Sequence, residues 1–528
     1  METTNPSTFT VYSSCLLLLL LLVVAVSWKA LNWVWFRPKK LEKRLKEQGF
    51  RGNPYKRLHG DFKDISALYT EAHSKNLRLS DDIVPRVIPE YLGAIKKYGK
   101  NTYLWFGPTP AVVIVDPNLM KEITQKVDVF PKPRLNAITK LLVQGVVTYE
   151  GEKWAKHRKL LNPAFHVEKL KLMLPAFYKS ASEMVTKWEN VVSPKGLAEV
   201  DVWPNLQALT SDAISRTAFG SNYEEGRRIF ELQREQTEHL MQLARSVYIN
   251  IPGYRFLPTK RSRRMKQIAR EVNGSVREMI NTRRKAMRAG EAGSDDLLGL
   301  MLQSNSQEIE KHGNKDSGMT TEEIVDECKL FYFAGQETTS ALLVWTMVLL
   351  CRYPEWQARA REEVLQQFGT KDPDFDGLNH LKIVTMILHE VLRLCPPLAT
   401  MSRRTIEETK LGNLTLPAGV QITLPIMLMH HDPDIWGEDV KQFKPERFAE
   451  GVSHATKGQV AYFPFSWGPR TCIGQNFAML EAKLAMSMIL QRFSFELSPS
   501  YTHAPRTGTA ISLIQPQYGA HLILQKII

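Results

Sequence analysis

Residues 463–475, FPFSWGPRTCIGQ, place one cysteine in a loop of aromatic, glycine, proline and arginine residues. Behind Cys472, apolar residues at three- and four-residue spacing in residues 474–493 predict a helix. The free N–H groups and positive dipole end of that helix would face the sulfur and stabilise a thiolate, the form of cysteine that binds metals. Gly468 and Gly474 would allow turns or close approach that a side chain would block. The stretch therefore predicts that Cys472 is a metal ligand.

The metal at Cys472 would have to bring most of its own ligands. The five cysteines stand at long spacings, without C-x-x-C or H-E-x-x-H motifs, so neither a zinc cage nor an iron–sulfur cluster is predicted. His430 and His431 are adjacent, and neighbouring side chains of an extended segment point to opposite faces, which disfavours a second metal site. Haem needs only one axial thiolate. A buried structural cysteine is the alternative, but it would not account for the surrounding glycines and arginine.

Residues 465–474, FSWGPRTCIG, fit the pattern F-x-x-G-x-R-x-C-x-G and resemble the haem-binding loop of the cytochromes P450, the haem-thiolate monooxygenases. The segments GFRGNPYKRLHGD, HHDPDIWGED and GPRTCIGQNFAMLEAKLAM resemble the plant family-72 branch, which includes enzymes like secologanin synthase and deoxyloganate hydroxylase. The resemblance implies haem b between a long distal helix and the helix after the cysteine loop. It also implies that Phe465 and Gly474 belong to the cofactor-binding loop.

Residues 334–339, AGQETT, resemble the oxygen-activation motif of that distal helix. Gly335 would leave room for dioxygen, while Glu337 and Thr338 would relay protons, since an acid beside an alcohol can do so. The alternative is a helix break whose backbone is satisfied by the threonine hydroxyls. Residues 330–351 approach membrane-spanning length, but a central acid is costly in lipid, so a buried core helix is predicted.

Glu390 and Arg393 form an E-x-x-R pair that one turn of helix brings together. Alone, such a pair is more typical of a surface salt bridge. The resemblance implies instead a buried network with Arg447, whose loss prevents haem incorporation.

Arginine suits the planar carboxylates of haem propionates better than lysine does. The resemblance assigns this role to Trp154 and Arg158 of WAKHR, and to Arg470 and Arg404, with Arg403 as an alternative to Arg404. His157 is interpreted as a surface or structural histidine.

Substrate contacts are expected before WAKHR, beside the oxygen motif and after E-x-x-R. The candidates are Ile138, Leu141, Phe333, Ala334, Leu398 and Met401. Cys395 and residues 506–517, RTGTAISLIQPQ, depart from the branch, and the second departure bears on substrate identity.

Helical periodicity dominates the chain, and strand signals are short and few, so the predicted fold class is mainly α with minor β-sheet. Helices are predicted in residues 141–165, 224–248, 321–353, 354–368, 378–394 and 474–493, and strands in TYLWFG with AVVIV, LPAGVQITLP, and FELSP with HLILQ. Because no long linker interrupts the chain, residues 53–528 are predicted to form a single catalytic haem domain.

Residues 11–28 carry no charge and are long enough to cross a membrane. Basic residues follow, so residues 1–10 are expected in the lumen of the endoplasmic reticulum and the body in the cytoplasm. A cleaved signal peptide is the alternative, but the positive segment that precedes a signal is missing. Residues 29–52 are predicted to be a basic, proline-containing hinge in which the chain breaks away at residues 37–39 and a short amphipathic helix, KKLEKRLKEQG, then ends at Gly49. Asn273 and Asn413 should then carry no glycan.

The formal charge is +14. Residues 260–266 and 283–288 are basic, yet no nucleic-acid-binding motif accompanies them, so anionic lipid or an acidic protein is the expected partner. The resemblance implies electrons from NADPH through a separate cytochrome P450 reductase, with cytochrome b5 as a second donor.

The predicted function is oxidation of a plant terpenoid, first an iridoid or secoiridoid of the deoxyloganate or loganin type, by hydroxylation or ring cleavage. A triterpenoid or gibberellin-type oxidase is the alternative within the branch. Outside it, a hydroperoxide isomerase that does not use dioxygen and a non-enzymatic haem-binding membrane protein remain open.

Overall fold

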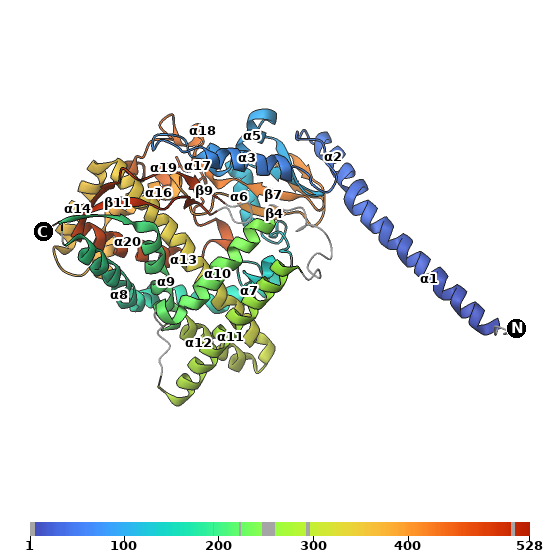
Figure 1. Cartoon of the computed structure of the whole chain (residues 1–528), viewed down its shortest axis with the longest axis horizontal. Coiled ribbons are helices and arrows are strands. Elements are labelled where there is room, and N and C mark those ends of the chain that lie inside the picture. Colours follow the sequence, from blue (N-terminus) through green and yellow to red (C-terminus); the bar gives the residue numbers. More distant parts are fainter. Residues whose placement is uncertain are drawn as a thin grey trace.

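The structure is a computed structural model that describes residues 6–193, 195–220, 223–244, 259–291, 296–507 and 513–527. A helical body carries four small sheets, and one long helix, α1 (Pro6–Leu31), projects away from it (Figure 1). The predicted class, mainly α with minor β-sheet, is confirmed.

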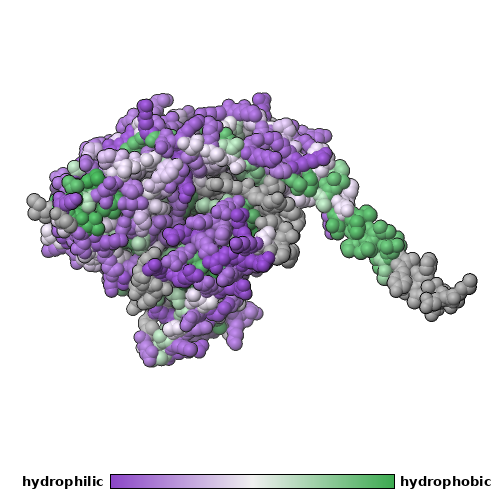
Figure 2. All heavy atoms as spheres, viewed as in Figure 1, coloured by the Kyte–Doolittle hydropathy of each residue, from purple (hydrophilic) through white to green (hydrophobic). Residues whose placement is uncertain are grey.

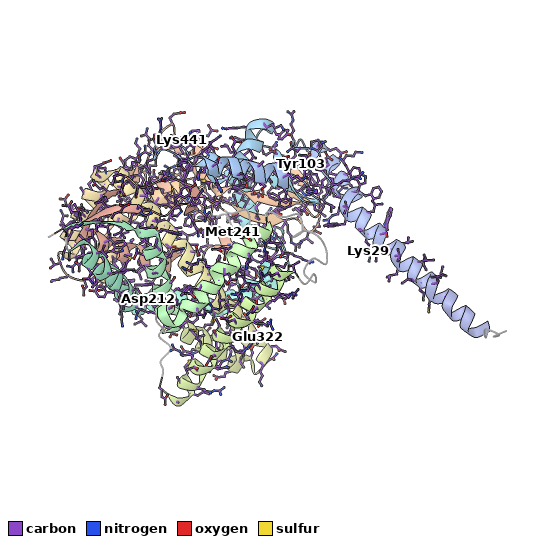
Figure 3. The ribbon with its side chains drawn as sticks, in the orientation of Figure 1. Lys29, Tyr103, Asp212, Met241, Glu322 and Lys441 are labelled. Atoms are coloured by element: carbon purple, nitrogen blue, oxygen red, sulfur yellow. The ribbon has the colours of Figure 1, made fainter. Side chains whose placement is uncertain are left out.

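Helix α1 is apolar and exposed, as expected of a helix that faces lipid. The side chains of residues 16–22 are between 54% and 66% exposed. The helix is long and apolar enough to cross a membrane, and Figure 2 shows it as an apolar arm on a mainly hydrophilic body. In Figure 3 the side chain of Lys29 lies on this arm, apart from the packed side chains of the body.

The predicted break at residues 37–39 is wrong, because the helix continues through Pro38. A π-helical turn, η1 (Asn32–Phe36), joins α1 to α2 (Arg37–Glu47), and the Arg37 N–H donates to the Asn32 carbonyl. Proline excludes the usual bond to the carbonyl four residues earlier, and a π-turn accommodates this. That carbonyl, of Val34, accepts a hydrogen bond from the Tyr55 hydroxyl at 2.7 Å instead.

Helix α13 (Thr321–Arg352) runs through the middle of the body (Figure 1). Its N-terminus has a capping box, in which Thr320 and Glu323 bond each other's backbone N–H groups. It packs against α9, α11, α16 and α20, so it is the predicted core helix.

The helix predicted over residues 141–165 is present only as α7 (Gly151–Leu161), between short 3₁₀ turns at Thr139–Leu141 and Asn162–Phe165. Tertiary contacts with Glu327 replace helical hydrogen bonds in the missing part. The Val146 N–H donates to Glu327 at 3.0 Å, and Gly145 has φ +92° with no room for a side chain beside that carboxylate.

The remaining helices follow the apolar periodicity. They include α3 (Phe62–Ser74), α5 (Pro89–Tyr98), α6 (Pro117–Gln125), α8 (Val167–Val192), α9 (Val202–Phe219), α10 (Tyr223–Ala244), α11 (Lys260–Ala289), α12 (Leu297–His312), α14 (Pro354–Phe368), α15 (Phe375–His380), α16 (Lys382–Leu394) and α20 (Gln475–Arg492).

The largest sheet has the order β1-β2-β7-β4, in which β2 and β7 are parallel and the other pairs antiparallel. Its strands are β1 (Thr102–Phe106), β2 (Thr109–Val113), β7 (Gln421–Leu424) and β4 (Met401–Arg404). A second sheet joins β3 (Leu197–Asp201), β11 (His521–Lys526) and β8 (Phe493–Leu497), and two hairpins are β5 (Thr409–Leu411) with β6 (Leu414–Leu416) and β9 (Pro505–Arg506) with β10 (Gln515–Pro516). The predicted strands are present as β1, β2, β7, β8 and β11, and β1 pairs with β2 and β8 with β11. The strands that were not predicted are β3, β4 and the β5–β6 and β9–β10 hairpins.

One cluster of buried apolar side chains extends from Leu41 and Leu45 of α2 to Leu524 of β11. Part of the segment predicted as a hinge is therefore packed into the core of the body.

Candidate functional site

The loop before α20 gives Cys472 a fixed position. Gly468 has φ +75°, and a Cβ atom there would lie 2.7 Å from the Thr124 carbonyl oxygen, so only glycine fits. The Cys472 N–H donates to the Phe465 carbonyl at 2.8 Å. These two backbone constraints fix the position of the Cys472 backbone and so of its sulfur.

The Cys472 side chain is accessible although it lies inside the molecule. The side chain has solvent-accessible surface, yet the surrounding protein removes most of the water around the thiol. This burial is the largest influence on the Cys472 thiol and raises its pKa. The Gly474 N–H and the charges of Arg158 and Lys132 lower the pKa in opposition. A Cβ atom on Gly474 would lie 4.0 Å from the sulfur and 4.0 Å from the Phe165 ring, so glycine keeps the side of the sulfur that it faces open.

Arg158 and Lys132 lie near this sulfur, and Arg403 and Arg470 lie near Lys132, with the carboxylate of Glu150 among them. Glu150 accepts from Arg470 at 2.7 Å and from the Lys132 N–H at 3.2 Å. Burial lowers the pKa of Lys132 to about 7, and the charges of Arg403 and Arg470 add to the shift. Burial and Arg470 likewise lower the pKa of Arg403 to about 10. The site carries a surplus of positive charge that a bound anion would offset.

Three of the predicted cofactor ligands lie together at this cluster. The Arg470 guanidinium stands 4.4 Å from the centre of the Trp154 ring, and Arg158 donates to the Thr471 carbonyl at 2.8 Å. Trp154 and Arg158 come from α7, whereas Arg470 comes from the cysteine loop.

Arg403 and the predicted Arg404 both lie at this cluster, and Arg403 is the more deeply buried. Successive residues of β4 face opposite sides. Arg403 is 3% exposed and feels the charge of Arg470, while Arg404 donates to the Lys132 carbonyl and feels the charge of Arg134. Among the described residues, the Nε atoms of Arg403 and Arg470 are buried without a hydrogen-bond partner.

These residues fit haem. One thiolate serves the iron, no atom lies closer than 4.0 Å to a Cβ position on Gly474, and the unpartnered Nε groups of Arg403 and Arg470 suit propionate carboxylates.

The middle of α13 is more accessible than the rest of this core helix. Residues 333–338 are partly accessible, whereas residues 328–332 and 339–348 are buried. Burial raises the pKa of Glu337 to about 7, against the opposing effects of a hydrogen bond from Gln515 and the charge of Arg234. The Thr338 hydroxyl donates to the Ala334 carbonyl at 2.8 Å, so the predicted back-bonding is present, but it does not break the helix.

Gly335 has a role in helix packing. A Cβ atom there would lie 2.9 Å from two side-chain carbons of Ile214 on α9. The glycine therefore lets α9 approach α13, and the room for dioxygen expected at this residue stays a prediction.

The substrate candidates fall into two groups. Ile138, Leu141 and Phe333 pack in one small cluster with Leu142, Val143, Leu240, Leu243 and Met265. Leu398 forms a β-bridge with Leu513, which connects the segment after E-x-x-R to the C-terminal hairpin. Met401 lies at the start of β4, and Ala334 is partly buried on α13.

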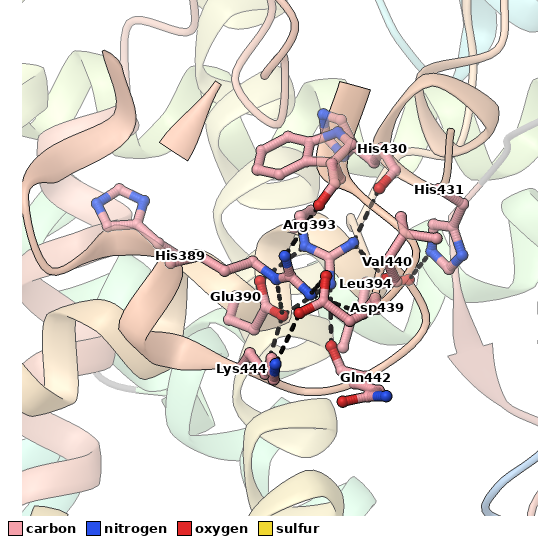
Figure 4. A network of polar contacts seen from close by, with 12 residues as sticks. His389, Glu390, Arg393, Leu394, His430, His431, Asp439, Val440, Gln442 and Lys444 are labelled. Carbon is pink, nitrogen blue, oxygen red and sulfur yellow. Dashed lines mark hydrogen bonds and ion pairs between the residues drawn. The ribbon is translucent and has the colours of Figure 1, made fainter. Parts of the chain in front are cut away.

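Glu390 and Arg393 lie in one network of polar contacts (Figure 4), and Arg447 reaches the same carboxylate. Arg393 forms two hydrogen bonds of 2.7 Å with Glu390 and donates to the His430 and Val440 carbonyls. Arg447 approaches Glu390 at 3.5 Å. Both Glu390 and Arg393 are fully buried, unlike a surface pair.

In the described parts of the unusual segment 506–517, two glutamine side chains form hydrogen bonds with distant residues. Gln517 accepts from the buried Arg86 at 2.6 Å, and Gln515 donates to Glu337 at 2.6 Å. Residues 508–512 lie outside the described residues. Cys395, the other departure, is buried, which raises the pKa of its thiol to about 12.

The sequence analysis did not assign three residues to the site: Gln515, Lys132 and Arg234. Gln515 is 178 positions from Glu337, and no local pattern connects them. His157 is fully buried against Glu327 at 2.6 Å, so it is structural and not a surface residue.

Comparisons with known proteins agree with this arrangement. The sequence model of the family described as Cytochrome P450 matches residues 91–524. Cytochrome P450 CYP72A219 of Panax ginseng is 61% identical over 510 residues, which cover 96% of this chain and 98% of that protein. 7-deoxyloganic acid hydroxylase of Catharanthus roseus is 58% identical, with 95% and 96% covered. 11-oxo-beta-amyrin 30-oxidase of Medicago truncatula is 54% identical, with 96% of each covered.

Proposed function

The chain belongs to the cytochrome P450 family, and we propose that it is a membrane-anchored monooxygenase that oxidises a carboxylate-bearing plant terpenoid. The observation that carries this proposal is a lone cysteine whose accessible sulfur lies inside the molecule among surplus buried cations. Haem, the cofactor of the family, supplies the iron that activates dioxygen when it is bound.

The chain's own residues have distinct proposed roles. Cys472 would ligate the iron of haem, Phe465 and Gly474 would shape the loop around the sulfur, and the cations of the site would hold the propionates. These cations are Arg158 and Arg470, beside Trp154, with Lys132 and with Arg403 in place of Arg404.

Glu337 and Thr338 are the proposed proton-delivery residues. A carboxyl with a pKa near neutrality can give up and regain a proton at physiological pH. This role distinguishes a monooxygenase from a hydroperoxide isomerase, which needs no such delivery.

Two observations support an acidic terpenoid as the substrate. The relative from Catharanthus roseus is named for an acid, 7-deoxyloganic acid. In addition, the charge of Arg234 on α10 reaches Glu337, and Arg234 has no hydrogen bond or ion pair with a described residue. A substrate carboxylate would supply that partner. A triterpenoid, as in the name of the Medicago truncatula relative, is the second candidate.

We further propose that α1 anchors the chain in the endoplasmic reticulum with its body in the cytoplasm. The basic residues of α2 follow the apolar helix, and such residues favour the cytoplasmic side. There a separate NADPH-dependent reductase, with cytochrome b5 as a second donor, would supply electrons.

The test is a screen of terpenoid acids and neutral triterpenoids in microsomes that contain added reductase, with the chain and with Cys472→Ser. We expect NADPH-dependent oxidation of an acidic terpenoid, and loss of both turnover and the red-shifted carbon-monoxide band in the variant. An unchanged spectrum and unchanged turnover in Cys472→Ser would contradict the ligand assignment. Oxidation of neutral substrates alone would contradict the substrate class.

A further inference from the structure

A single hydrogen bond connects the C-terminal hairpin to the middle of α13. The Gln515 side-chain amide on β10 donates to one carboxylate oxygen of Glu337, Oε2, at 2.6 Å. The other oxygen, Oε1, has no hydrogen bond to a described residue. We propose that Gln515 is a positioning residue, which holds the Glu337 carboxyl in one orientation and leaves its second oxygen to exchange protons. This inference rests on the proton-delivery role of Glu337 proposed above.

The backbone around Gln515 is fixed firmly enough for this task. Gln515 pairs with Arg506 across the hairpin, and the neighbouring Ile514 N–H donates to the Pro397 carbonyl at 3.0 Å. The Ile514 carbonyl accepts from the indole N–H of Trp345 at 3.1 Å. Trp345 belongs to α13, as Glu337 does, so the donor and the acceptor are held on one rigid frame.

The orientation of the Glu337 carboxyl matters because rotation of the group exchanges the positions of its two oxygens. With Oε2 held by an amide donor, the proton that Glu337 gives up or takes from water is located at Oε1. A donor to the carboxylate also stabilises its ionised form, which opposes the effect of burial.

Among the described residues, two further titratable groups near Glu337 bear on its protonation. Arg234 of α10 is the charged group whose field acts on it, and it also favours the ionised form. Glu481 of α20 lies against Thr339, which is on the same helix as Glu337, and burial raises the pKa of Glu481 well above its ordinary value. In the part of the chain that the structure describes, Gln515 is the one side chain that donates a hydrogen bond to the Glu337 carboxyl.

The experiment compares Gln515→Leu and Gln515→Glu in the full-length, haem-loaded protein. The protonation of Glu337 is followed by infrared spectroscopy, from the carboxyl band that disappears in Glu337→Gln, as the pH is varied. We expect the midpoint to rise by about one pH unit in Gln515→Leu, since the amide donor is lost, and further in Gln515→Glu, where a second carboxyl shares the site. Gln525→Leu, the same change at an exposed position of β11, should leave the midpoint unchanged.

A second readout concerns coupling with the substrate from the screen. Gln515→Leu should keep its haem and release more hydrogen peroxide per NADPH, with the pH profile of coupling displaced in the same direction. An unchanged infrared midpoint in both Gln515 variants would overturn the inference. If Glu337→Gln itself remained fully coupled, the proposed role of Glu337 would fail instead, so the two failures are distinguishable.

Discussion

The Glu390 carboxylate and the Arg393 guanidinium meet at two contacts of 2.7 Å, and neither side chain is exposed to solvent. The Lys444 N–H adds a third hydrogen bond to the carboxylate at 2.9 Å, and carbonyls of the following loops accept from Arg393. Since these loops precede the cysteine loop, the pair fixes the backbone that leads to the cofactor site.

Glu390→Gln should therefore prevent normal haem incorporation. The change leaves the Arg393 charge buried without its partner, which lowers the free energy of unfolding by roughly 3–5 kcal/mol. The measurement is haem content per immunodetected protein, together with chemical unfolding. Glu71→Gln, which removes one half of an exposed pair with Lys75 at 2.6 Å, is the matched control and should behave as wild type. Full haem content in Glu390→Gln would show that the pair has no structural role.

The sequence alone suggested this network only because the motif resembles that of a known family. A Glu and an Arg three positions apart occur on many exposed helices, and the chain does not show which backbone carbonyls will meet the guanidinium. The cysteine loop was more predictable, since its glycines act locally: Gly468 is required by its own φ and by Thr124.

Lys132→Met should stabilise the haem-free protein and weaken the retention of haem in the loaded protein. Without haem, the variant should be more stable, because a buried cation that is repelled by Arg403 and Arg470 has been removed. With haem, it should lose the cofactor roughly tenfold faster, since a charge-assisted contact to a propionate is missing. Unfolding of the haem-free protein and transfer of haem to excess apomyoglobin measure the two effects. Lys126→Met, at an exposed lysine paired with Glu122, should change neither. Equal haem-transfer rates in both variants would remove Lys132 from the site.

Truncation separates the anchor from the packed helix behind it. Removal of residues 1–31 should reduce membrane binding and leave the unfolding transition in place. Removal of residues 1–47 should also take away Leu41 and Leu45, which are 6% and 0% exposed, at about 2–5 kcal/mol for each buried leucine. Thermal unfolding and flotation with vesicles are the measurements. If both truncations unfolded at the same temperature, α2 would act as a free hinge, as the sequence suggested.

The limits of sequence reasoning lie in contacts between distant segments. The periodic helices α13, α14 and α20 were located closely, because their apolar faces repeat along the chain. The region around Gly145 was misjudged because a carboxylate on another helix, Glu327, binds its backbone. Gln515 could not be predicted either, because its partner, Glu337, is 178 positions away, and the departure of residues 506–517 from the related branch does not identify that partner.

Arg234→Gln tests the acidic substrate class. Arg234 lies on α10, its charge acts on Glu337, and no described residue pairs with it. We expect the KM for a terpenoid acid to rise roughly tenfold, as for loss of a charge-assisted hydrogen bond, while the KM for the methyl ester of the same acid stays unchanged. Arg228→Gln is the matched control on the same helix, where the guanidinium is occupied by Glu271 at 2.8 Å. An equal change for acid and ester would mean that Arg234 shapes the helix without binding the carboxylate, and the substrate class would then lose its structural support.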